Sequence, residues 1–164
     1  MNRTTEGGPE LGGGRGAGGV LVLVDPSGAG DGPVAAQLAR ELNPGVHLRT
    51  ADFLRAIRGD QPPPHLPEAG RRHAAALAAA AQAAFAYATR GYQVVVECRT
   101  APAALDTFRR ESRATGTTLH YVVLHPGPAP DGTTHTLDTT DLTTETTTKS
   151  VLAALTHRTH LLGW

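Results

Sequence analysis

The stretch that decides the fold is VLVLVDPSGAGDGPVAAQLAREL, residues 20–42. It opens on residues 20–24, a continuous run of valine and leucine that is typical of a strand buried on both faces. Residues 25–32 are turn formers, and Pro33 suits the first turn of a helix. Helical spacing then puts three apolar side chains on one face: Val34, Leu38 and Leu42. The stretch therefore predicts a buried strand, a glycine-rich loop and a helix.

The rest of the chain repeats this alternation. We expect further strands at residues 46–49, 93–97, 119–124 and 134–137. We expect further helices at residues 51–58, 67–89, 102–115 and 143–157. Strands that alternate with helices imply right-handed crossovers and a parallel sheet covered on both faces. The sequence thus predicts an α/β fold of three layers, with a parallel sheet of about five strands.

Composition and charge limit the classes of function. The 164 residues, 40% of them hydrophobic, suffice for one core of ordinary size. Fifteen Lys plus Arg balance fifteen Asp plus Glu, so we expect no binding to nucleic acid or to a membrane surface. Residues 1–19 are polar and glycine-rich, which predicts a disordered tail before a single domain at residues 20–164. With one cysteine and no apolar run of membrane-spanning length, we expect a cytoplasmic protein.

The candidate site lies where the strands end. In parallel sheets, ligands bind beyond the carboxyl ends of the strands, so the residues that follow each strand are the first to inspect. Asp25, Asp52, Glu97 and His125 stand there, and Asp31 lies in the glycine-rich loop. Crowded carboxylates raise one another's pKa and supply general acids and bases. The sequence predicts an acid-lined crevice whose catalytic residues are Asp52, Glu97, Asp31 and His125.

The loop itself is close to a phosphate-binding motif but lacks its chemistry. In G-x-x-x-x-G-K-[ST], the backbone cradles phosphate, the lysine neutralises it and the hydroxyl holds magnesium. Aligned on Gly30, this chain has Asp25 at the first glycine, Asp31 at the lysine and Gly32 at the hydroxyl residue. The only lysine is Lys149, far along the chain. We take the remaining loop positions as candidate ligand contacts: Asp25, Ser27, Gly28 and Gly30.

These segments resemble the P-loop kinase-like nucleoside triphosphatases, in particular the chloramphenicol phosphotransferase and zeta-toxin groups. The similarity covers residues 20–155: the first strand, loop and helix, then HLRTADFLRAIRGDQPPPHLPEA, GYQVVVECRTAPAALDTFR, LHYVVLHP and the C-terminal HTLDTTDLTTETTTKSVLAAL. The resemblance implies the fold and sheet order of that family. It also implies that Asp52 and His73 can face the phosphoryl acceptor.

Two departures from the family's pattern bear on activity. Asp31 puts a carboxylate where a polyanion would bind, and residues 126–135 carry no arginine where the family has an arginine-bearing lid. Because phosphoryl transfer depends on positioning and charge stabilisation, these losses remove most of its basis. The sequence thus predicts a degenerate Walker A loop, and we expect neither a working ATP-dependent kinase nor a bound cofactor.

Three functions stay open at this stage. The first is a repurposed kinase-like protein that binds a non-nucleotide small molecule and performs acid/base chemistry such as isomerisation, cyclisation or dehydration, by analogy in specialised metabolism. The second is a non-catalytic, pseudokinase-like scaffold, which is favoured if its own side chains fill the crevice. The third is a residual phosphotransferase in which Arg99 replaces the missing lysine.

The remaining candidates have simpler interpretations. Arg99 can bind a ligand carboxylate or pair with Glu97, and Cys98 most simply packs in the core. His157 and His160 share a helix face, but two histidines alone do not define a metal site, so we expect them to be solvated and expect no metal. The alanine face at residues 74–84 suits close packing within the domain or in a homo-oligomer.

Overall fold

A computed structural model describes residues 9–13, 17–26, 32–99, 103–129 and 135–162. The elements follow one another as β1 (Gly19–Val24), α1 (Pro33–Glu41), β2 (Gly45–Arg49), α2 (Thr50–Arg55), α3 (Pro67–Ala88), β3 (Gln93–Cys98), α4 (Ala103–Thr115), β4 (Thr118–His125), β5 (Thr136–Asp138) and α5 (Thr144–Thr156). The expected alternation of strands and helices is confirmed. The second helix is shorter than residues 51–58 and begins directly where β2 ends.

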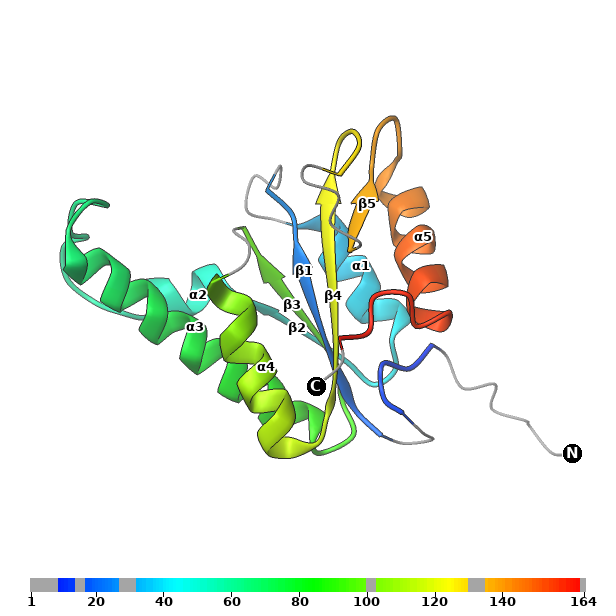
Figure 1. Cartoon of the computed structure of the whole chain (residues 1–164), viewed down its shortest axis with the longest axis horizontal. Coiled ribbons are helices and arrows are strands. Elements are labelled where there is room, and N and C mark those ends of the chain that lie inside the picture. The colour runs from blue at the N-terminus through cyan, green and yellow to red at the C-terminus, as the bar shows by residue number, and fades with distance from the viewer. Residues whose placement is uncertain (1–8, 14–16, 27–31, 100–102, 130–134, 163–164) are drawn as a thin grey trace, which may run out of the picture.

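The sheet has five parallel strands in the order β2-β3-β1-β4-β5. The first strand of the chain lies at its centre, where Val22 pairs with Val96 of β3 on one side and Tyr121 of β4 on the other. Helices α1 and α5 cover one face, and α2, α3 and α4 lie on the other (Figure 1). The predicted three-layer α/β fold is therefore confirmed.

The central strand explains why both faces of the sheet are packed. All six residues of β1 are buried, and successive side chains point to opposite faces. Val20, Val22 and Val24 join the core beneath α3 and α4, which contains Phe85 and Phe108. The leucines of β1 join the core beneath α1 and α5, which includes Leu38, Val151 and Leu155. The alternation of valine and leucine in VLVLV thus places one residue type on each face.

Part of the segment that the sequence assigned to a disordered tail packs against the domain. Leu11 is fully buried and joins the core beneath α1 and α5. Its N–H donates to Gln93 Oε1 at 2.6 Å, and its carbonyl accepts from Thr118 Oγ1 at 2.7 Å and from His120 Nε2 at 3.0 Å. The tail assignment is therefore wrong for this residue, because an apolar side chain and three polar partners hold it.

The C-terminal segment covers an open sheet edge. β5 pairs only with the last three residues of β4, and Leu161 forms an antiparallel bridge with His120 further down the same strand. The expectation of a solvated His160 is wrong: this side chain is buried and its ring centroid lies 5.6 Å from that of His135. Burial lowers the pKa of His160. Within the described residues, no helix is both long and apolar enough to span a bilayer.

Candidate functional site

The carboxyl ends of the parallel strands meet at one edge of the sheet, and a cavity opens beside this edge. It lies between α2, α3 and the end of β3 and has a volume of about 330 Å³. Its lining is mostly apolar and is formed by Ala51, Leu54, Ala76 and Leu77. The polar or charged side chains of the lining are those of Thr50, His73 and Arg99, and Cys98 adds a thiol. A pocket of this size, with few polar groups, is at the small end of ligand sites.

A second cavity extends the first between α3 and the chain that follows α2. It has a volume of about 160 Å³ and shares Leu54 and His73 with the larger cavity. The remaining residues of its lining are Gln61, Pro62, Pro64, Ala69 and Arg72. The proline-rich stretch after α2 therefore forms one wall of an elongated, largely apolar space.

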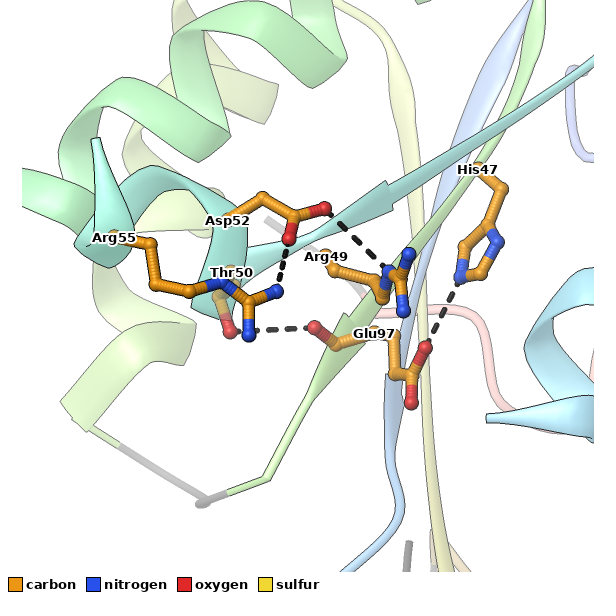
Figure 2. A network of polar contacts seen from close by, with 6 residues as sticks. All are labelled: His47, Arg49, Thr50, Asp52, Arg55 and Glu97. Atoms are coloured by element: carbon orange, nitrogen blue, oxygen red, sulfur yellow. Dashed lines mark hydrogen bonds and ion pairs between the residues drawn. The ribbon is translucent and has the colours of Figure 1, made fainter. Parts of the chain in front are cut away.

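Asp52 lies close to the cavity but is held in ion pairs outside it. Its carboxylate accepts from Arg55, and its Oδ2 lies 3.4 Å from Nε of Arg49 (Figure 2). The hydrogen bond from Arg55 lowers the pKa of Asp52, with a smaller contribution from the charge of Arg49. The side chain is half exposed, so this carboxylate is ionised and partnered. A lowered pKa is the opposite of what a general acid at neutral pH requires.

Glu97 is buried and faces the start of α1. Its Oε2 lies 3.0 Å from Nε2 of His47, and its backbone carbonyl accepts from Thr50 Oγ1 at 3.2 Å (Figure 2). A Cβ built on Gly32 would overlap the Glu97 carboxylate. The carboxylate thus fills the space that a side chain at position 32 would need. This explains physically why glycine occupies that position, where the motif has a hydroxyl residue.

The acid-lined crevice stays a prediction, because Asp31, one of its carboxylates, lies outside the described residues. None of the described residues that line either cavity is acidic. Asp52 and Glu97 belong to neighbouring parts of one polar network, yet their carboxylates have separate partners (Figure 2). Glu97 pairs with His47 rather than with Arg99. Asp52 and Glu97 are thus paired with arginine and histidine side chains and do not appear in the lining of either cavity.

The other sequence candidates divide into three groups. Arg99 and His73 line the larger cavity. Asp25 and His125 do not line it: the Asp25 N–H donates to the Cys98 carbonyl at 3.0 Å, and His125 ends β4. Four predicted residues, Ser27, Gly28, Gly30 and Asp31, lie outside the described residues.

Cys98 behaves as a packing residue. It is buried in the core cluster beneath α3 and α4, and burial raises the pKa of its thiol to about 12. The neutral thiol is a poor nucleophile. Its side chain forms part of the wall of the larger cavity.

Sequence reasoning missed the apolar residues that shape the cavity, above all Leu54, Ala76 and Leu77. In the sequence they have the same helical spacing as core residues, so no motif marks them. Pro62 and Pro64 line the smaller cavity, a role that no motif in the sequence indicates. Among the described residues, no group of three or more potential ligands is placed to hold a metal ion.

The strand order, the parallel sheet and the helices on both faces define a P-loop kinase-like α/β fold. Solved structures of this fold include the APS kinase CysC of Mycobacterium tuberculosis in complex with AMPPNP and APS, with 16% identity, a TM-score of 0.65, and coverage of 85% of this chain and 98% of that one. The tunicamycin resistance protein of Deinococcus radiodurans matches at 14% identity and a TM-score of 0.58, covering 84% of this chain and 95% of that one. A gluconokinase from Sinorhizobium meliloti matches at 18% identity and a TM-score of 0.55, covering 89% and 95%.

The likeness lies in the fold. No family model matches the sequence, and no curated protein matches it either. Identities below one fifth carry over the arrangement of strands and helices, and function must be argued from the site.

Proposed function

We propose that this protein binds a small, largely apolar molecule in the cavity between α2 and α3, and that it has lost ATP-dependent phosphoryl transfer. The observation that carries the proposal is the lining of the cavity, which is apolar over most of its wall and includes no carboxylate among the described residues. Apolar pockets with a few placed polar groups are the usual form of small-molecule sites. A kinase-like fold supplies the frame, and the chain's own residues set what it accepts.

The proposal that ATP-dependent phosphoryl transfer is lost rests on the charges near the start of α1. Asp31 stands at the lysine position of the motif, and the only lysine in the chain, Lys149, lies on α5. Its Nζ pairs with Glu145 Oε1 of the same helix at 3.0 Å. At the start of α1, where a P-loop would meet phosphate, the Glu97 carboxylate lies against Gly32. Two acidic residues in place of a cation and a hydroxyl disfavour a bound polyanion.

Acid/base catalysis by Asp52, Glu97, Asp31 and His125 stays a prediction and does not carry this proposal. In the described structure, the Asp52 carboxylate is paired with Arg49 and Arg55, and the Glu97 carboxylate is paired with His47. The open cavity also counts against the scaffold alternative, which expects the crevice to be filled by the protein's own side chains. A homo-oligomer likewise stays a prediction.

A residual phosphotransferase is the second candidate. One observation favours it: the solved structures with this fold include kinases, one of them holding AMPPNP and APS. In this alternative, Arg99 at the end of β3 takes the place of the missing lysine. It requires nucleotide binding, which the first proposal excludes, so the two are distinguished by titration with ATP.

Filling the cavity tests the first proposal. We expect octanol, a neutral apolar probe, to bind the native protein with a Kd of about 1 mM or below, near −4 kcal/mol. Ala76→Leu puts a larger side chain into the cavity wall and should weaken binding at least tenfold, because it removes the volume that the probe needs. Isothermal titration calorimetry measures both values.

The matched control is Ala79→Leu, the same substitution on the exposed face of the same helix. It should leave octanol affinity unchanged. Thermal melting of both variants checks that they are folded. Equal affinity of the native protein and Ala76→Leu would contradict the assignment of the cavity as the binding site.

A further inference from the structure

The cavity has a charge preference that its size alone does not reveal. Arg99 and His73 line it, Arg72 lines its smaller extension, and among the described residues neither lining contains an Asp or Glu. The ionisable side chains of the described lining, the deeply buried thiol of Cys98 aside, are therefore bases. A ligand with a cationic group would meet like charge there without a counterion.

Two described carboxylates near the cavity are already paired outside it. Asp52 is shared between Arg49 and Arg55. Glu97 is turned toward His47 and the start of α1. Neither carboxylate belongs to the lining of the two cavities.

Arg72 is already used by the protein itself. Its guanidinium donates to three backbone carbonyls of the chain that follows α2, at 2.7 Å to Asp60, 2.9 Å to Arg58 and 3.4 Å to Ile57. It therefore fixes the loop that walls the smaller cavity. Within the described part of the chain, Arg99 and His73 have no such hydrogen bond or ion pair, which leaves both available to a ligand.

We propose that the ligand of this cavity is a small organic carboxylate, with its apolar body between α2 and α3 and its carboxylate at Arg99. The proposal rests on the proposed function and adds the chemical class of the ligand. A guanidinium matches a carboxylate with two parallel hydrogen bonds, and such charge-assisted pairs are stronger than neutral ones. His73 adds a ring nitrogen to the same wall, while Ala51, Leu54, Ala76 and Leu77 supply the apolar surface.

Three probes with one apolar chain and different head groups test the charge preference. Octanoate, octanol and octylamine are titrated calorimetrically into the full-length protein. We expect octanoate to bind at least tenfold more tightly than octanol, and octylamine more weakly than octanol. In Arg99→Gln the preference for octanoate should fall to less than threefold while octanol affinity is retained. Arg110→Gln, which removes an exposed arginine of α4 outside the lining, should keep the full preference.

The outcomes distinguish the carboxylate proposal from the proposed function, which is that the cavity binds a small apolar molecule. If octanol binds and Ala76→Leu weakens its binding at least tenfold, but octanoate binds no more tightly than octanol, the cavity stands as a binding site and the carboxylate proposal is wrong. The carboxylate proposal is also wrong if octylamine binds best, or if Arg99→Gln leaves the preference intact. If none of the three probes binds the native protein, both proposals are contradicted.

Discussion

Leu11→Ala is expected to lower the free energy of unfolding by about 3 kcal/mol, within the range measured for leucine-to-alanine changes in protein cores. Leu11 has no exposed surface and packs with the residues beneath α1 and α5. The backbone hydrogen bonds to Gln93, Thr118 and His120 involve no side-chain atom of Leu11, so the substitution isolates the loss of packing. For a chain of this size the midpoint of thermal unfolding should fall by about 9 °C.

Leu142→Ala is the matched control for this prediction. Leu142 is 37% exposed, so the same change should cost less than about 0.5 kcal/mol. Chemical denaturation of the two variants gives both values under one set of conditions. If Leu11→Ala cost as little as Leu142→Ala, the segment around Leu11 would be a tail after all, and its contacts would add nothing to stability.

Gly32→Ser should destabilise the protein by about 2 kcal/mol, because the new side chain needs the space of the Glu97 carboxylate. Serine is favourable at the N-cap of a helix, so capping alone predicts no loss at this position. The cost arises when Glu97 is pushed from His47 and a buried carboxylate loses its partner. A hydroxyl side chain at position 32, as in the motif, would thus compete for space with the Glu97 carboxylate.

A double-mutant cycle identifies the cause. In the Glu97→Ala background, Gly32→Ser should leave the free energy of unfolding nearly unchanged. The coupling energy between the two substitutions should therefore be about 2 kcal/mol. Gly70→Ser serves as the control at a second glycine, because a Cβ at Gly70 meets no other atom within 4 Å. Additive costs for Gly32→Ser and Glu97→Ala would show that the two positions do not compete for space.

The fold could be predicted from the sequence because its pattern is local and redundant. The run VLVLV is typical of a strand buried on both faces, and it forms β1; the place of β1 at the centre of the sheet is known from the structure. The helix expected at residues 67–89 is the long α3, and Gly91, with φ of 91°, follows its end. The exception is Leu11, a single apolar residue among glycines, whose backbone hydrogen-bond partners Gln93 and Thr118 lie more than 80 residues away.

The site was harder to predict because its chemistry depends on pairing. Asp52 and Glu97 were chosen as carboxylates that follow strands, but the sequence does not show that Arg55 and His47 would bind them. Nor does it show that Leu54 and Leu77 would line a cavity rather than a packed core. Arg99 is a candidate from the sequence because it follows the third strand, and His73 because the resemblance to the kinase family implies that it faces the acceptor. Both line the larger cavity, and their roles stay predictions. The positions of residues relative to the strands thus indicated which end of the sheet to inspect. The charge of the cavity lining could be described only from the structure.

Calorimetric titration with ATP in the presence of magnesium tests the central claim most directly. On the proposed function, this kinase-like fold has given up its nucleotide site, with Asp31 and Glu97 where a cation and a hydroxyl would be needed. We therefore expect no binding at nucleotide concentrations up to about 1 mM, a limit near −4 kcal/mol. A Kd in the micromolar range, about −8 kcal/mol, would contradict the proposed function and establish a nucleotide-binding protein instead.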